Sequence, residues 1–126
     1  MDQTEKESVD LYSIAEEKPT RSLSAVFRVH ITVKRIDILS MQGIDTYDQS
    51  YLDAMRKHFD ISLATNGYMT LYDVASRLLL PVKAPWVFFG WNYEKHDHIH
   101  MTWNFKGKGV TIFFTAYEIW KGDFDK

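Results

Sequence analysis

The chain has 126 residues, which is enough for one hydrophobic core and too few for two. It contains no cysteine, so disulfides, thiol nucleophiles and thiolate metal sites are excluded, and a reducing compartment is favoured. A net charge of −2 argues against dense, non-specific binding to nucleic acid, and no apolar run reaches the ~20 residues of a membrane span. Since the first residues are also unlike a signal peptide, we expect a cytoplasmic protein.

Residues 1–22 are rich in acidic side chains and poor in apolar ones. Such a segment buries too little apolar surface to offset its ordering entropy, so we expect a flexible tail in front of a globular domain over residues 23–126. One apolar island interrupts it, with Leu11, Tyr12 and Ile14 as candidates for self-association. The tail is interpreted equally well as a docking segment or as an inert solubilising one.

Apolar and polar side chains alternate over residues 24–34, which predicts a half-buried strand. A helix follows over residues 49–59, and its expected core-facing residues are Leu52, Met55 and Phe59. A second helix is expected to begin at Thr70, because Thr-x-x-Asp resembles a capping box, and to stop before Pro81.

The remainder of the chain has the patterns of three strands, at residues 86–89, 97–105 and 110–120. Residues 106–109 contain two glycines and predict a hairpin between the last two strands. The fold class expected from this order is α+β, with a mainly antiparallel sheet of about four to five strands and two helices packed on one face.

A histidine cluster is the most conspicuous polar feature. His96, His98 and His100 would share one face of a strand, about 7 Å apart, and an H-x-H pair can supply two zinc ligands. The sequence specifies no third ligand. Histidines on an exposed strand beside aromatic residues are the competing interpretation, and no metal or other cofactor is expected.

Two short motifs also resemble each other, since both read His-apolar-Thr-apolar. They begin at His30 and His100, and each would place its histidine and its threonine (Thr32 or Thr102) on the same face of a strand. The pair resembles the paired motif of the 2H phosphoesterases. That resemblance implies histidines acting as general acid and base on cyclic or 2′,5′-linked nucleotides, with the threonine hydroxyls holding phosphate oxygens.

Other signatures of an enzyme do not occur in the sequence. It has no glycine-rich phosphate loop and no nucleophile elbow, and Asp123 and Asp125 stand in a polar C-terminal end. Basic residues are spread along the chain without forming a stripe, so no direct sequence-specific contact with nucleic acid is expected. Binding is therefore preferred over catalysis, and an accessory factor that inhibits another protein also fits the composition.

The order of elements over about residues 24–120 resembles the matrix proteins of rhabdoviruses. The similar segments are the strand Val26–Lys34, the helix Tyr51–Asp60, the apolar helix Leu71–Leu80 and the polar-aromatic hairpin from His100 to Ile112. The resemblance implies a structural protein of host cytoplasm and virion that self-associates, binds the nucleoprotein complex and attaches it to the inner membrane leaflet. Its tail would dock on a neighbouring copy through Leu11–Ile14. The acidic tail departs from the basic tail usual in that family.

Overall fold

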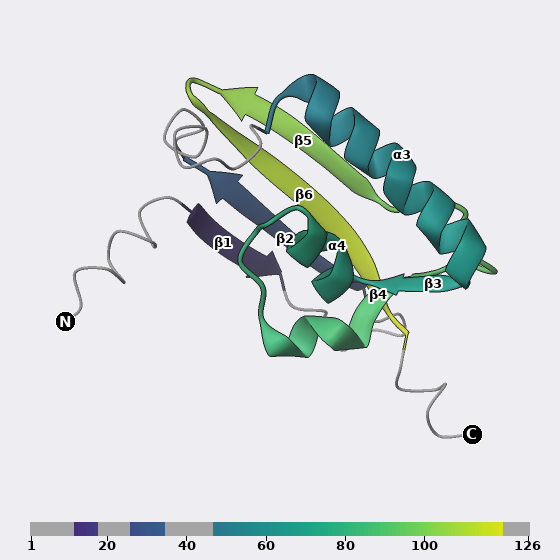
Figure 1. The fold of residues 1–126 in the computed structure, drawn as a ribbon. Coiled ribbons are helices and arrows are strands. Elements are labelled where there is room, and N and C mark those ends of the chain that lie inside the picture. The colour runs from purple at the N-terminus through teal and green to yellow at the C-terminus, as the bar shows by residue number, and fades with distance from the viewer. Residues whose placement is uncertain (1–11, 18–25, 35–46, 120–126) are drawn as a thin grey trace.

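The computed structural model describes residues 12–17, 26–34 and 47–119 (Figure 1). The strands are β1 (Tyr12–Glu17), β2 (Val26–Val33), β3 (Tyr68–Thr70), β4 (Phe89–Asn92), β5 (Met101–Lys106) and β6 (Gly109–Glu118). The helices are α3 (Gln49–Asn66), α4 (Leu71–Arg77) and the short 3-10 helix η1 (Ala84–Phe88). The predicted α+β class is confirmed, and the antiparallel sheet has six strands in place of the expected four or five.

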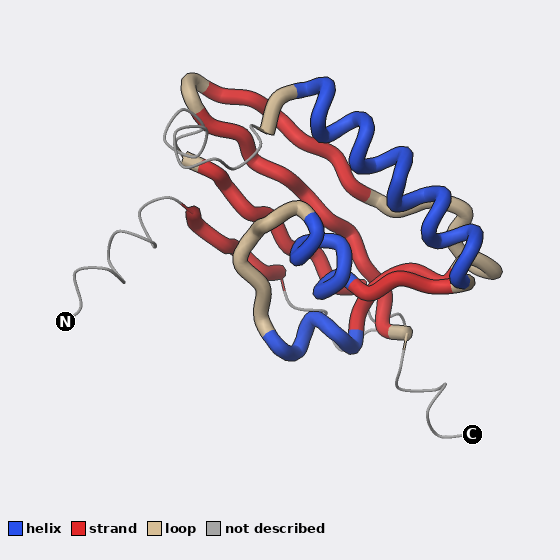
Figure 2. Tube along the Cα trace, viewed as in Figure 1, coloured by secondary structure: helices blue, strands red, loops and turns tan. Residues whose placement is uncertain are grey.

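The sheet is built around β6, which pairs with three other strands (Figure 2). The strand order is β1-β2-β6-β4-β3, and β5 pairs with β6 ahead of the point where β4 joins it. The ladder between β2 and β6 runs from Val26 opposite Tyr117 to Val33 opposite Val110. The predicted hairpin turn is present between β5 and β6, where Gly107 has a φ of 60°. Every pairing is antiparallel.

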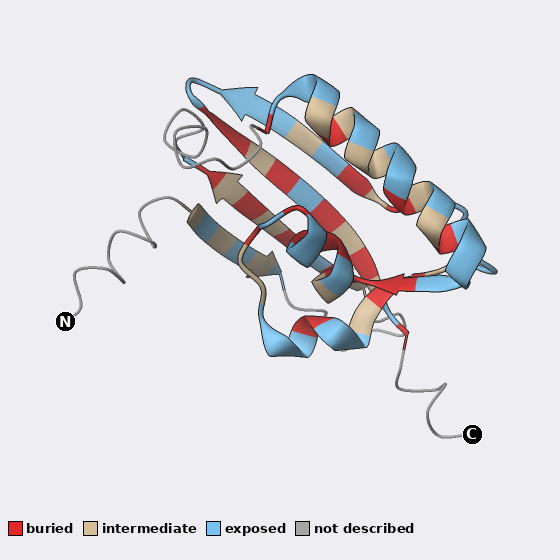
Figure 3. Cartoon of the chain, in the orientation of Figure 1, coloured by how far each residue is buried: buried red, intermediate tan, exposed pale blue. Residues whose placement is uncertain are grey.

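The core lies on one face of this sheet, and the two α-helices cover that face (Figures 1 and 3). Alternate residues of the paired strands are buried there, among them Ile31 and Ile112, which stand opposite each other. The helices bury one stripe each, and their fully buried residues are Leu52, Phe59, Leu63, Leu71, Val74 and Ala75. The opposite face of β2 and β6 carries half-buried and exposed residues.

Helix α3 continues to Asn66, seven residues beyond the predicted end. Leu63 extends the stripe of Leu52 and Phe59, and the helix ends at Gly67, whose φ of 90° suits a glycine cap. Helix α4 begins as predicted, because the Thr70 hydroxyl accepts the backbone N–H of Asp73 at 3.0 Å.

The expected strand at residues 86–89 is wrong for its first three residues, which belong to η1. Pro85 stands in the first turn of η1, where its fixed φ favours a helical turn and its missing N–H costs nothing. Strand β4 begins only at Phe89. The short strand β3 was not predicted, since three residues show too little alternation.

The segment Tyr12–Glu17 forms the edge strand β1, and so differs from the flexible tail expected over residues 1–22. Tyr12 and Ile14 pack half-buried against the core. Trp86 Nε1 donates to Glu16 Oε2 at 2.9 Å, and Lys83 Nζ lies 3.5 Å from the same oxygen. These contacts come from residues far along the chain, so the local composition of residues 12–17 does not reveal them. Leu11 lies outside the described residues.

Gly90 provides a stability test of the sheet. A methyl group at Gly90 would overlap the Met69 carbonyl oxygen and stand 2.7 Å from Thr70 Cα, both in the paired strand β3. We expect Gly90→Ala to lower the free energy of unfolding by at least about 3 kcal/mol, as overpacking against backbone does. The control Gly107→Ala has open space and a positive φ, so it should cost about 1 kcal/mol. Urea denaturation of both variants measures the difference, and equal losses would contradict the proposed clash.

Candidate functional site

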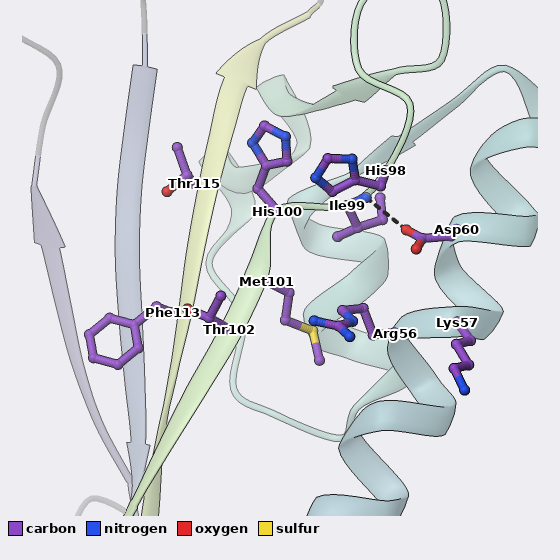
Figure 4. A pocket seen from close by; sticks show the side chains of 10 residues that line it. All are labelled: Arg56, Lys57, Asp60, His98, Ile99, His100, Met101, Thr102, Phe113 and Thr115. Carbon is purple, nitrogen blue, oxygen red and sulfur yellow. Dashed lines mark hydrogen bonds between the residues drawn. The ribbon is translucent and has the colours of Figure 1, made fainter.

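A groove of about 710 Å³ lies between α3 and the start of β5 (Figure 4). We call it the histidine groove. It is lined by Arg56, Lys57, Asp60, His98, Ile99, His100, Met101, Thr102, Phe113 and Thr115. Helix α3 contributes the charged residues, the segment leading into β5 contributes the histidines, and β6 contributes Phe113 and Thr115.

The histidines of the groove lie in a loop, so the prediction of one strand over residues 97–105 is wrong for its first four residues. Tyr117 holds this loop in place through two contacts. The His96 ring stacks on the Tyr117 ring with 4.2 Å between centroids, and the Tyr117 hydroxyl lies 2.9 Å from His100 Nδ1. The Asp60 carboxylate accepts the backbone N–H of Ile99 at 2.8 Å (Figure 4), which ties the loop to α3. Neither Tyr117 nor Asp60 was selected from the sequence.

The three clustered histidines do not converge on one point. The Nδ1 atom of each already has a partner: the Asn92 N–H at 3.2 Å for His96, an Asp97 carboxylate oxygen at 2.7 Å for His98, and the Tyr117 hydroxyl for His100. Within residues 12–17, 26–34 and 47–119, no three His, Cys, Asp or Glu residues form a group able to hold a metal ion. The alternative zinc site at His96, His98 and His100 is therefore not formed.

The two His-x-Thr motifs share one face of the sheet. His30 stands opposite Phe113 in β6, and Phe113 stands opposite Thr102 in β5, and residues directly opposite in a ladder point to the same side. The backbone carbonyl of His100 accepts the N–H of Thr115 at 3.1 Å, which continues that register. All four motif residues therefore belong to the face that the helices leave uncovered.

The two motifs nevertheless do not line the histidine groove together. Strand β6 separates β2 from β5, so the two motifs stand two strand spacings apart, or about 10 Å. The Phe113 ring stands next to His30, with 5.3 Å between ring centroids, and His30 does not line the histidine groove. The hydroxyls of Thr32 and Thr111 lie 3.0 Å apart and bond to each other. The histidine groove is therefore lined by His100 and Thr102 of the second motif and by neither residue of the first.

The positive charges that α3 contributes to the histidine groove are paired with an acidic residue of the same helix. Arg56 Nη2 lies 3.3 Å from Asp53 Oδ1, Lys57 Nζ lies 3.5 Å from Asp53 Oδ2, and the Arg56 guanidinium also covers the Trp103 ring at 5.2 Å. Because these groups are partly exposed, each ion pair contributes little to stability. Partial burial and the neighbouring histidines lower the pKa of both His96 and His100.

A second groove, of about 720 Å³, lies at the β1 edge of the sheet. We call it the edge groove. It is lined by Tyr12, Ser13, Ile14, Lys34, Leu79, Leu80 and Pro81, so it contains two of the three residues selected for self-association. Leu79, Leu80 and Pro81 were not selected. Their signal in the sequence is the run of three leucines before Pro81, which was assigned only to the second helix.

Leu79 stands at this groove in an unfavourable backbone conformation. Its φ is 62°, in the left-handed region that favours glycine, and its side chain is 54% exposed. The buried Tyr47 hydroxyl donates to the carbonyl oxygens of Leu78 at 2.6 Å and Leu79 at 3.3 Å. Tyr47 therefore helps to hold the turn that presents Leu79 to solvent.

The lowered pKa values of His96 and His100 predict how stability depends on pH. Below the ordinary histidine pKa of about 6.5, the unfolded chain binds protons that these two folded histidines still resist. The free energy of unfolding should therefore fall between pH 7.5 and 5.5. Urea denaturation should show a smaller fall for the His96→Gln, His100→Gln double variant, with His58→Gln, at an exposed position of α3, as the control. An unchanged pH dependence in the double variant would contradict this assignment.

Comparison with protein-family models, curated proteins and solved structures finds no match to this chain. What the protein does is therefore inferred from the geometry of its two grooves.

Proposed function

We propose that this protein is a non-enzymatic assembly protein of viral matrix-like type that self-associates through the edge groove. The observation that carries the proposal is Leu79, a large apolar side chain held exposed at the groove. A left-handed conformation costs a non-glycine residue about 1–2 kcal/mol, and glycine or asparagine would avoid most of that cost. Backbone strain of this kind clusters at active sites, ligand clamps and switch regions, and so it favours a functional role for Leu79.

The position of β1 supports the same proposal. β1 is the last strand of the sheet on its side, and within the described residues no strand pairs with its outer edge. An edge strand presents backbone N–H and C=O groups that pair readily with another chain. An apolar groove lies beside this edge, so backbone pairing and apolar burial are available in one place.

The proposed partners are a second copy of the chain and a nucleoprotein complex, as the matrix-like resemblance implies. The resemblance also implies attachment to the inner membrane leaflet, for which an amphipathic or charged surface would serve. Among the helices that the structure describes, none is long and apolar enough to cross a bilayer. Self-association is the part of the proposal that has a defined surface.

Replacing Leu79 separates association from folding. Leu79→Gly and Leu79→Asn should change the free energy of unfolding by less than about 1 kcal/mol, because relief of the left-handed strain offsets the lost contacts. Each copy would lose the burial of half a leucine, or about 1 kcal/mol, so a symmetric dimer should weaken at least about tenfold. Light scattering over a concentration series measures the association constant.

The matched control for this experiment is Ile61→Gln. Ile61 is 66% exposed on α3 and lines neither groove, so this variant should associate like the wild-type chain. Equal weakening by Ile61→Gln would indicate non-specific apolar contact. A wild-type chain that remains monomeric at every concentration would contradict the proposed self-association.

A 2H-type phosphoesterase is the second candidate, and its one supporting observation is the shared face of the two His-x-Thr motifs. Because Phe113 and β6 stand between the histidines, we expect no hydrolysis of 2′,3′-cyclic or 2′,5′-linked nucleotides above background. Wild type, His30→Ala and His100→Ala should be indistinguishable in a nucleotide assay. Hydrolysis by the wild type that either variant abolishes would favour the enzyme.

A further inference from the structure

We infer that β1 pairs antiparallel with β1 of a second copy, about a two-fold axis at Ile14, so that two six-stranded sheets join into one. The inference rests on the proposed self-association and names its occupant and its register. A symmetric contact is expected because the same edge is then used by both copies. The argument for this pairing comes from the faces of β1 and from the placement of its acidic residues.

The two faces of β1 restrict the possible registers. Tyr12, Ile14 and Glu16 stand opposite Val33, Ile31 and Val29, on the core face, whereas Ser13, Ala15 and Glu17 belong to the other face. A two-fold axis perpendicular to the sheet keeps the two cores on the same side. Residues that pair across the axis must then come from the same face, so the axis lies midway between the two copies of one residue and not at a point between successive residues.

Charge selects one of these registers. With the axis at Ile14, Ile14 stands opposite Ile14 of the second copy, and Tyr12 stands opposite Glu16. Moving the axis to Ser13 would pair only residues 12–14 of the described strand across the axis, and moving it to Glu16 would oppose two identical carboxylates. Like charges directly opposite destabilise a ladder, whereas an aliphatic pair at the centre stabilises it. An axis at Ala15 avoids like charges but places Glu16 opposite Ile14, and Tyr12 then lies outside the described residues that pair across the axis.

Contacts within one copy already prepare Glu16 for this position. Its carboxylate accepts the Trp86 Nε1–H at 2.9 Å and lies 3.5 Å from Lys83 Nζ. An acidic residue on the inner face of an edge strand usually prevents pairing with other chains. Here the charge is balanced by Lys83, so it does not repel the edge of a second copy.

The edge groove accommodates the apolar side chains of the second strand. Leu79, Leu80 and Pro81 line the groove with Tyr12 and Ile14. In the proposed register, Ile14 of the second copy lies on the core face of the joined sheet and packs into this groove. The exposed part of Leu79 would then be buried between the copies, which accounts for its retention in a strained conformation.

The native chain has no cysteine, so single introduced cysteines report the register in the full-length protein. We expect Ile14→Cys to form a disulfide-linked dimer under mild oxidation, at least about tenfold faster than Ala15→Cys or Thr102→Cys, because directly opposite side chains are within reach of a disulfide. Ser13→Cys mixed with Ala15→Cys should give a cross-linked heterodimer, whereas either variant alone should not. This mixed pair uses exposed positions, and so it tests the register even if Ile14→Cys folds poorly.

The outcomes separate this inference from the proposed function. If the chain self-associates but Ala15→Cys or Thr102→Cys cross-links as fast as Ile14→Cys, the register is wrong and self-association stands. If the mixed pair and Ile14→Cys both fail to cross-link in a sample that light scattering shows to be oligomeric, the β1 contact is wrong. If no oligomer forms at any concentration, the proposed function and this inference both fail.

Discussion

The antiparallel ladder between β2 and β6 is the interaction on which the rest of this structure depends. It pairs eight residues of each strand and buries an apolar side chain at every second position of both. β6 also holds β5 and β4 through its remaining backbone groups, and β2 holds β1. The histidine groove and the edge groove therefore lie at edges that are positioned, through one or two pairings, by the same central ladder.

Two tyrosines then determine the local shape of the two grooves. Tyr117 uses the uncovered face of β6 to hold His96 and His100, and Tyr47 bonds to the carbonyl groups of the turn that contains Leu79. Each tyrosine is distant in sequence from the segment that it positions. Since β1 and β5 lie on opposite sides of β6, an assembly formed through β1 leaves the histidine groove accessible to another partner.

Regular patterns in the sequence were interpreted correctly where burial alone decides the structure. The alternation in β2 and β6 and the side-chain cap at Thr70 each reflect a local rule that tertiary packing does not oppose. The errors occur where a distant partner or a proline decides instead. The local composition of Tyr12–Glu17 predicts a flexible segment, but the segment forms a strand. Its partners Trp86 and Lys83 lie about seventy residues further along the chain, where a local pattern does not reveal them. Pro85 similarly turned an apolar run into a 3-10 helix.

The candidate sites divide in the same way. The sequence identified Tyr12 and Ile14 as candidates for self-association. It also identified His30, Thr32, His100 and Thr102 as two matching His-x-Thr motifs, because residue type and spacing are local properties. It could not show that Tyr12 and Ile14 form an edge strand, that Phe113 lies beside His30, or that Leu79 is exposed in a left-handed turn. By itself the sequence determined the class of fold and the faces of its main strands, because hydrophobic periodicity is local. Only the tertiary structure decided which faces and edges meet, because strand pairing joins residues far apart in the chain.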